Sequence, residues 1–310
     1  MNSSFSKSMP TLQLGWDSTS LKALLKCPRY YQLTIIEGWT PRSQNADLRF
    51  GILYHGALER YDHARAEGQD QTSATRIALR YALEQTWERD LNRPWISDNP
   101  NKNRMTLIRT IVWYLDQFGE SDPIKTVVLA NGKPAVELSF QLQLDYKSQL
   151  TGEDMQYCGH LDRLGEAADQ NIYILDRKTT KHTLDDTYFE GFTPDPQFTG
   201  YIFSGKIVYE LPIRGIIADA AQVMVNGSRF ERRQIARTQD QLDEWHRGLG
   251  YWLTSAQLHA RANFWPMNDA ACFRCHFRGI CSKPQSTRED WLRAGFVKRE
   301  WDPLKARGDI

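Results

Sequence analysis

The sequence lacks the features that mark membrane and secreted proteins. It contains no run of about 18 consecutive apolar residues, which a membrane-spanning helix requires. Its N-terminal segment has no apolar core of the kind found in a signal peptide. Neither sign of charge dominates, because 39 Lys and Arg are balanced by 38 Asp and Glu. We therefore expect a cytoplasmic protein without a membrane partner, in which 310 residues form one large domain or two ordinary ones.

Cysteine is scarce, and its number is odd. The chain has five cysteines, so they cannot all pair with one another. A disulfide framework is also not expected in a protein without an export signal. These cysteines are therefore expected to be metal ligands, catalytic groups or core residues.

The hydrophobic pattern changes its period along the chain. Apolar residues recur at helical spacing from Phe50 to Tyr61, and two further helices are predicted at about 73–91 and 104–118. Residues 50–120 are thus predicted to form a helical lobe. The period of two then predicts strands at 136–144, 156–164, 172–178, 216–225 and 229–236. Asp195 and Pro196 suit the start of a helix that runs to about residue 209, and a long helix is predicted around 242–256. The fold class is α/β, with a central mixed sheet in residues 125–236 flanked by helices.

Two acidic residues lie on neighbouring predicted strands. Asp176 and Lys178 end one strand, and alternation places their side chains on the same face. Asp162 lies on the preceding strand, so the two carboxylates converge if these strands pair. Converging carboxylates suit Mg²⁺ or Mn²⁺, and a lysine beside them can orient or deprotonate a water. This combination is typical of phosphodiester hydrolysis.

These residues occur in an order that resembles the RecB-like branch of the PD-(D/E)XK nuclease superfamily. The matching motifs are Gly159-His160-Leu161-Asp162, Asp176-Arg177-Lys178 and Gln197-x-x-x-Tyr201, preceded by His55 on a predicted helix. Glu137, on the strand before Asp162, is the candidate for a further acidic residue of the family. The resemblance implies a restriction-endonuclease-like core within a single nuclease domain over residues 1–310. It also implies that His55, Asp162 and Asp176 bind the metal, that Lys178 acts on the water, and that Gln197 and Tyr201 contact the strand being cut.

Three of the cysteines lie close together near the C-terminus. Cys272 and Cys275 form a Cys-x-x-Cys pair, Cys281 follows five residues later, and Cys27 stands far upstream. A short loop with this spacing can direct several sulfur atoms at one metal or cluster. Zinc is one alternative, with His276 or His259 as a spare ligand. Cys158, on the strand of Asp162, is expected to be a core residue.

The same arrangement resembles the iron–sulfur members of the nuclease family, which include AddB-type subunits, CRISPR-associated adaptation exonucleases and the nuclease domain of the eukaryotic Okazaki-fragment helicase–nuclease. In these proteins one cysteine precedes the nuclease core and three follow it. The resemblance, which runs from about residue 16 to 282, therefore implies a 4Fe–4S cluster that joins both ends of the domain. Its ligands would be Cys27 and three cysteines of the loop 265–285, namely Cys272, Cys275 and Cys281.

Residues 200–206 fit the pattern Gly-x-x-x-x-Gly-Lys of a nucleotide-binding loop. Such a loop needs Ser or Thr next, where this chain has Ile207, and a preceding strand, where a helix is expected. We therefore do not expect ATP-driven unwinding, which would have to come from a helicase or another recombination or adaptation partner.

The expected function is metal-dependent DNA hydrolysis by an exonuclease that prefers single-stranded ends. Two other functions fit parts of the pattern. One is a catalytically silent module that binds DNA ends, and the other is a zinc-stapled scaffold protein in which the Asp-x-Lys sequence is accidental.

Overall fold

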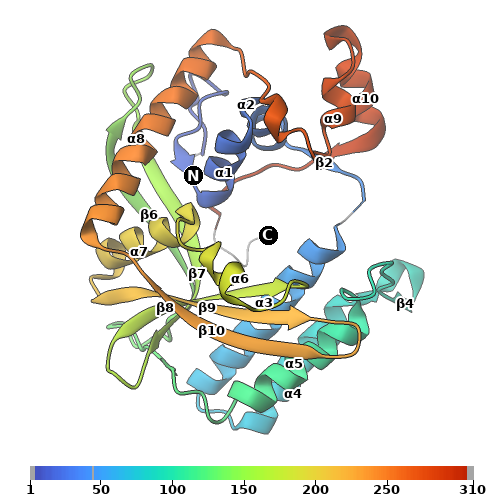
Figure 1. Cartoon of the computed structure of the whole chain (residues 1–310), viewed down its shortest axis with the longest axis vertical. Helices are drawn as coiled ribbons and strands as arrows, with labels where there is room; N and C mark the ends of the chain where they lie inside the picture. The colour runs from blue at the N-terminus through green and yellow to red at the C-terminus, as the bar shows by residue number, and fades with distance from the viewer. Residues whose placement is uncertain (1–3, 44, 306–310) are drawn as a thin grey trace. The chain divides into compact units, whose positions relative to one another are not determined.

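The structure, a computed structural model, describes residues 4–43 and 45–305. The chain divides into two compact units that interleave along the sequence. One unit contains the segments Met1–Ser43, Ser139–Gly159 and Thr238–Ile310, and the other contains Gln44–Leu138 and His160–Arg237. Figure 1 labels the main elements of each unit. The expected single nuclease domain over 1–310 stays a prediction.

A seven-stranded mixed sheet underlies the candidate site. Its order is β1-β7-β8-β9-β10, and β5 and β6 also pair with β7. The strands are β1 (Gly15–Trp16), β5 (Lys125–Thr126), β6 (Val136–Lys147), β7 (Asp154–Glu166), β8 (Ile172–Thr180), β9 (Ile213–Val223) and β10 (Ser228–Ala236). β8 runs parallel to β9, whereas β7–β8 and β9–β10 are antiparallel. The sequence-based prediction of a mixed sheet flanked by helices is confirmed.

Three helices form the lobe expected at residues 50–120. They are α3 (Ala46–Ala66), α4 (Gln71–Gln85) and α5 (Arg104–Phe118). Their buried side chains form one core with Ala221 and Val223 of β9, so the lobe packs on one face of the sheet. The helix predicted at 73–91 ends earlier, because Trp87–Glu88 (β3) and Arg93–Pro94 (β4) form a small hairpin around the 3-10 turn η2 (Arg89–Leu91).

α7 (Pro196–Tyr209) covers the other face of the sheet in the same unit. The Asp195 carboxylate accepts the N–H groups of Gln197 at 2.8 Å and Phe198 at 3.0 Å, which confirms the predicted helix start. Gly205 allows close packing, since a Cβ there would lie 2.9 Å from Cδ1 of Ile213. A short helix, α6 (Asp186–Glu190), precedes α7 and was not predicted from the sequence.

The other unit brings together the N-terminal and C-terminal segments of the chain. It contains α1 (Ser18–Lys26), α2 (Pro28–Tyr31), the π-helical turn η1 (Gln32–Ile36), β2 (Trp39–Pro41), α8 (Gln239–Ala262), η3 (Asp269–Ala271), α9 (Arg278–Cys281), η4 (Gln285–Thr287), α10 (Arg288–Gly295) and β11 (Phe296–Lys298). β2 and β11 pair antiparallel. Leu33 and Trp39 share one buried cluster with Phe277, Ile280 and Phe296. Residues from both ends of the chain therefore form a common core around the cysteine-rich loop.

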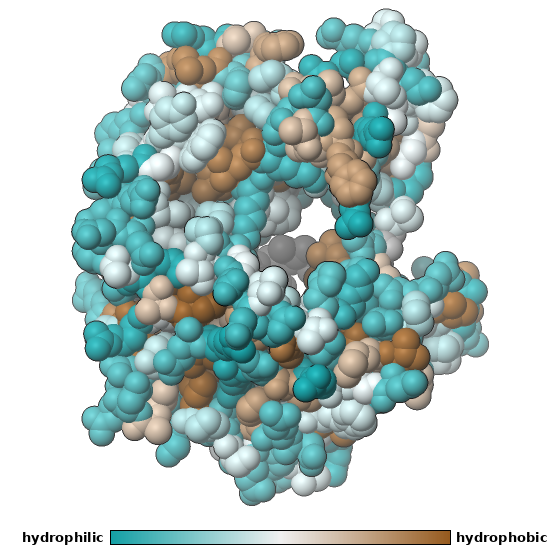
Figure 2. All heavy atoms as spheres, in the orientation of Figure 1, coloured by the Kyte–Doolittle hydropathy of each residue, from teal (hydrophilic) through white to brown (hydrophobic). Residues whose placement is uncertain are grey.

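Hydrophilic side chains cover most of the face seen in Figure 2, and hydrophobic ones appear there as small scattered areas. Within residues 4–43 and 45–305, none of the helices combines the length and apolar character that crossing a bilayer would demand.

Candidate active site and cysteine cavity

α3 carries His55 on the edge of its buried face. Asn45 caps the helix by accepting the N–H of Asp47 at 2.8 Å. Phe50, Tyr54 and Leu58 are fully buried on this helix, whereas the His55 side chain keeps 21% of its surface exposed. The imidazole therefore leaves the apolar core and faces a polar environment.

His55 contacts one of the two predicted metal carboxylates. Nδ1 of His55 lies 3.2 Å from Oδ2 and 3.3 Å from Oδ1 of Asp162. Oδ2 of Asp162 also accepts the main-chain N–H of Arg177 at 2.8 Å. This hydrogen bond fixes the Asp162 carboxylate against β8, just beyond the last described residue pair of β7 and β8, Arg163 and Leu175.

Asp176 and Lys178 form an ion pair on β8 between Oδ2 and Nζ. Burial raises the pKa of Asp176, and the nearby Asp162 carboxylate raises it too, whereas Lys178 and His55 lower it. Burial lowers the pKa of Lys178, but the Asp176 carboxylate outweighs burial, so the pKa of this ammonium lies above its ordinary value. Asp176 thus responds to Lys178, Asp162 and His55 in a largely buried site.

Gln197 and Tyr201 lie one turn apart on α7, as their spacing predicts. Nε2 of Gln197 donates to the Tyr201 hydroxyl at 3.1 Å. Burial, together with the Asp176 carboxylate, raises the pKa of Tyr201 to about 12. Because Asp176 acts electrostatically on Tyr201, this residue of α7 lies near the Asp176 part of β8.

The donor chemistry of this site fits a hard divalent cation. Asp162 and Asp176 offer carboxylate oxygens and His55 an imidazole nitrogen, which are ligands that Mg²⁺ and Mn²⁺ accept. A cation between these two buried carboxylates would offset the repulsion that raises the pKa of Asp176. As the side chains stand, no three His, Cys, Asp or Glu residues within the described ranges converge closely enough to hold one ion.

Glu137 lies at the second residue of β6 and is half-buried. Its backbone φ of +49° interrupts the regular alternation of the strand at this residue. The carbonyl of Ala135, two residues earlier, accepts the N–H of Leu164 at 2.9 Å, so this end of β6 runs beside the Asp162 part of β7. A role for Glu137 in the site stays a prediction.

Aromatic side chains that the sequence did not single out lie next to the ion pair of β8. Nζ of Lys178 lies 5.5 Å from the centre of the Phe198 ring. Phe192 stacks on Phe198 at 4.9 Å, and Tyr188 of α6 packs edge-on against Phe192 at 5.3 Å. Burial raises the pKa of Tyr188 to about 12, with opposing influences from Lys178 and Asp176. The only signal in the sequence is the density of aromatics between the Asp-x-Lys and Gln-x-x-x-Tyr motifs.

Four cysteines line one cavity in the other unit. They are Cys27, Cys272, Cys275 and Cys281, and Lys26, Tyr30 and Arg278 are among the other lining residues. The main-chain N–H of Asn268 donates to Sγ of Cys27 at 3.2 Å. Burial raises the pKa of Cys281, and the nearby Cys275 and Cys27 contribute in the same direction, which reflects their closeness. Cys27 thus lines the same cavity as the three cysteines of the C-terminal loop, from which most of the sequence separates it.

The remaining cysteine and the histidines have other surroundings. Cys158 is 1% exposed, and its thiol donates to the carbonyl of Trp16 at 3.1 Å. Its surroundings agree with the predicted core role. His276 packs against Phe277 with ring centres 4.4 Å apart, and His259 packs against Trp265 at 5.3 Å.

Comparisons with known proteins give a family match, and the similar solved structures include two described below. The family model of the PD-(D/E)XK nuclease superfamily matches residues 18–282. A crystal structure from Eubacterium rectale that bears the name "putative exonuclease" matches with a TM-score of 0.49 and 10% identity, covering 92% of this chain and 95% of that one. The protein SSO0001 matches with a TM-score of 0.35 and 10% identity over 87% and 86% of the two chains. A comparison with curated protein sequences gives no match.

Proposed function

Because the chain belongs to the PD-(D/E)XK nuclease superfamily, we propose that it is a deoxyribonuclease dependent on Mg²⁺ or Mn²⁺, and specifically an exonuclease that acts on single-stranded ends. The observation that carries this proposal is that His55 contacts Asp162, and that this carboxylate acts electrostatically on the buried Asp176–Lys178 ion pair. We further propose that it falls in the RecB-like, iron–sulfur branch of the superfamily.

Asp162, Asp176 and His55 would hold the catalytic cation. When bound, the cation supplies positive charge for the scissile phosphate and makes water a stronger nucleophile at neutral pH. The main-chain N–H of Arg177 holds the Asp162 carboxylate in place, and His55 fixes it from the side of α3. The chain's own residues thus preorganise the oxygen ligands before the substrate arrives.

Lys178 would act on the phosphate and the attacking water. Its ammonium can hydrogen-bond the water oxygen or a phosphate oxygen and offset the negative charge that grows in the transition state. In the reaction the water oxygen forms a bond to phosphorus, and the bond from phosphorus to the leaving sugar oxygen breaks. One water proton passes to solvent or a nearby base, and the leaving oxygen gains a proton. Gln197 and Tyr201 would position the strand beside this centre.

A preference for single strands is supported by an exposed aromatic side chain in the cysteine loop. Phe273 is 74% exposed, and the guanidinium of Arg274 lies 5.1 Å from its ring centre. Such a pair offers a stacking surface for an unpaired base and a positive charge for the adjacent phosphate. Arg278 adds a further cation in the same loop.

We propose that Cys27, Cys272, Cys275 and Cys281 ligate a 4Fe–4S cluster. Their shared cavity and the N–H donated by Asn268 to Cys27 support this assignment, since N–H donors commonly stabilise cluster sulfurs. Anaerobic purification followed by an absorption spectrum and iron and sulfide analysis tests it. Stoichiometric zinc without iron would identify the zinc-stapled alternative instead.

Unwinding of duplex DNA is proposed to need a separate helicase. Residues 200–206, which fit the nucleotide-loop pattern, lie inside helix α7, where they cannot form a phosphate-binding loop.

Digestion of end-labelled single-stranded and double-stranded DNA with Mg²⁺ or Mn²⁺ tests the proposed activity. We expect metal-dependent release of short products from single strands, inhibited by a chelator. Binding of DNA ends without cleavage under either metal would instead identify the catalytically silent module.

A further inference from the structure

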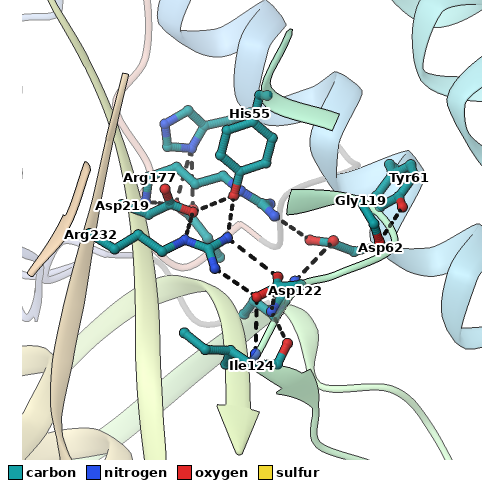
Figure 3. A network of polar contacts seen from close by, with 12 residues as sticks. His55, Tyr61, Asp62, Gly119, Asp122, Ile124, Arg177, Asp219 and Arg232 are labelled. Carbon is teal, nitrogen blue, oxygen red and sulfur yellow. Dashed lines mark hydrogen bonds and ion pairs between the residues drawn. The ribbon is translucent and has the colours of Figure 1, made fainter. Parts of the chain in front are cut away.

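A buried network of alternating charges lies beside the candidate active site (Figure 3). Three carboxylates and three guanidinium groups form it, so its formal charge is zero. The members are Asp62, Asp122, Asp219, Arg163, Arg177 and Arg232. Asp62, Arg163, Arg177 and Asp219 are each at most 5% exposed.

One contact in the network joins the helix of His55 to the strand of Asp176. Nη2 of Arg177 lies 2.6 Å from Oδ2 of Asp62 on α3. Asp62 follows His55 by seven residues, which is about two helical turns and places both side chains on the same side of α3. The pairs His55–Asp162 and Asp62–Arg177 are therefore two successive links between one helix and the sheet.

Arg177 is also connected to the metal carboxylates through its own backbone. It stands between Asp176 and Lys178, and alternation along β8 sends its side chain to the opposite face from theirs. Its main-chain N–H donates to Oδ2 of Asp162 at 2.8 Å. A change in the position of Arg177 would therefore move the Asp162 carboxylate and both neighbouring site residues.

The other ion pairs of the network restrain the contact between Asp62 and Arg177. Asp62 also accepts from Nη1 of Arg163 at 3.3 Å, and Arg163 reaches Asp122 at 2.9 Å. Asp122 in turn pairs with Arg232 at 2.7 Å. Asp62 and Asp122 are thus each shared between two guanidinium groups, which restricts the rotamers of Asp62 and Arg177.

Stability alone is a weak reason for such a network. Taking paired charges out of water costs about as much free energy as their attraction returns, and apolar side chains of similar size often stabilise a core equally well. What apolar side chains cannot provide is a directional link of fixed length between α3 and β8.

We propose that Asp62 and Arg177 are positioning residues, which hold α3 and β8 in the register that brings His55, Asp162 and Asp176 together. This inference rests on the proposed nuclease function. It assigns a role to Arg177, whose side chain points away from the site although it stands between Asp176 and Lys178. It also assigns a role to Asp62, which lies two helical turns beyond His55.

The test compares the parent with Asp62→Asn and with the double variant Asp62→Leu/Arg177→Met. Mn²⁺ binding, measured by the loss of the free-ion electron paramagnetic resonance signal, is followed together with kcat and KM for single-stranded DNA. Outer partners of metal ligands typically contribute 10- to 100-fold in affinity or activity. We therefore expect Mn²⁺ affinity and kcat to fall about 10-fold or more, KM for DNA to stay within about twofold, and the double variant to keep a cooperative thermal transition.

Tyr114→Phe is the matched control. The Tyr114 hydroxyl bonds Asp219 and accepts from Arg232 at 2.8 Å, so this change removes contacts of the same network other than the Asp62–Arg177 pair. It keeps the ring, whose centre lies 6.0 Å from Cζ of Arg177. We expect it to keep the Mn²⁺ affinity of the parent. Asp62→Glu and Arg177→Lys, which retain the charges, should recover part of the loss.

The possible results separate the two proposals. A parent that binds Mn²⁺ and cuts DNA, with a double variant of equal affinity and rate, overturns the positioning role alone. If the double variant does not fold, Asp62→Asn decides, since parent-like metal affinity and kcat in that variant also overturn the role. A parent that neither binds Mn²⁺ nor cuts DNA overturns the proposed function together with this inference.

Discussion

Nδ1 of His55 lies 3.2 Å from Oδ2 of Asp162, across 107 residues of sequence. The contact joins helix α3 to strand β7, so the site forms only when the helical lobe has packed on the sheet. Each side is also anchored locally, since a cap at Asn45 starts α3 and the Arg177 N–H holds Asp162. The chemistry of the site is therefore coupled to tertiary packing of this unit.

Asp176→Asn should abolish most cleavage while preserving the fold. The amide is nearly the same size as the carboxylate but carries no charge, so it weakens metal binding and loses the ion pair with Lys178. We expect the cleavage rate to fall by about a hundredfold or more. Binding of single-stranded DNA should persist, because it draws on a wider set of cationic and aromatic side chains. Gel-based cleavage assays and fluorescence anisotropy measure the two properties separately.

Asp169→Asn supplies the control for that substitution. Asp169 lies in the exposed turn between β7 and β8 and bonds Asn171, so it undergoes the same chemical change away from the site. It should cut DNA at the parent rate. A folded Asp176→Asn protein that also cuts at the parent rate would falsify the assignment of Asp176.

The fold was predictable where local chemistry determines it. Asp195 and Pro196 start α7 where capping rules place them, and the apolar run before Asp176 forms β8. The Gln197–Tyr201 contact follows directly from the helical repeat. In these cases neighbouring residues supply both the signal and the interaction.

The parts of the fold and the site that the sequence did not predict depend mostly on contacts between residues far apart in the chain. Asp62 and Arg177 are 115 residues apart, and no periodicity indicates that they pair. The sequence suggested that Cys27 joins the C-terminal cysteines only through a resemblance, whereas the cavity results from packing of both ends of the chain. The hairpin of β3 and β4 is a local exception: it pairs Trp87 with Pro94 and so ends α4 at Gln85, although the helical pattern continues.

Cys275→Ala should produce a colourless protein of lower thermal stability. A cluster that binds only the folded state contributes its binding free energy to folding, so loss of one ligand removes part of that stabilisation. Cys27→Ala should also give a colourless and less stable protein, because the Cys27 thiol lines the same cavity. Absorption spectra, iron and sulfide content and melting temperature of anaerobically purified proteins measure the effect.

Cys158→Ala is the matched control, because this thiol is buried but bonds the Trp16 carbonyl elsewhere in the same unit. It should keep the colour and the iron of the parent, with at most a modest loss of stability. If Cys275→Ala retains the full iron and sulfide content and the parent melting temperature, the four-cysteine assignment is wrong.

Lys102 gives the stability of the protein a distinct pH dependence. Its side chain is 1% exposed, and Nζ lies 4.3 Å from the Phe50 ring centre. Burial lowers the pKa of Lys102 from 10.5 to about 8, although Asp47 acts in the opposite direction. Between these two pH values the unfolded chain binds the proton more than the folded chain does. The contribution of Lys102 therefore makes the free energy of unfolding rise with pH over this window, by roughly 3 kcal/mol at most.

Lys102→Met should remove that rise and stabilise the protein near pH 7, where the parent carries a buried charge. Denaturant unfolding at pH 7, 8, 9 and 10 measures the difference between the two proteins. Lys133→Met, at an exposed position, controls for the loss of one positive charge. If the free energies of unfolding of Lys102→Met and the parent differ by a constant amount across this pH range, the lowered pKa of Lys102 is contradicted.

Tyr188→Ala should weaken the binding of single-stranded DNA without changing the metal site. The Tyr188 ring is half-buried, packs on Phe192 and lies within the electrostatic influence of Lys178 and Asp176, so it can stack on a base beside the scissile phosphate. Loss of one stacking platform removes about 1–3 kcal/mol, so KM for single strands should rise at least fivefold.

Tyr188→Phe should resemble the parent, because the ring is kept. Tyr209→Ala, at the C-terminal end of α7, makes the same chemical change away from the site and should leave KM unchanged. Steady-state cleavage of a labelled oligonucleotide gives KM and kcat for each variant. A parent-like KM in Tyr188→Ala would remove this residue from the substrate path, and equal losses in Tyr188→Ala and Tyr188→Phe would assign the contact to the hydroxyl.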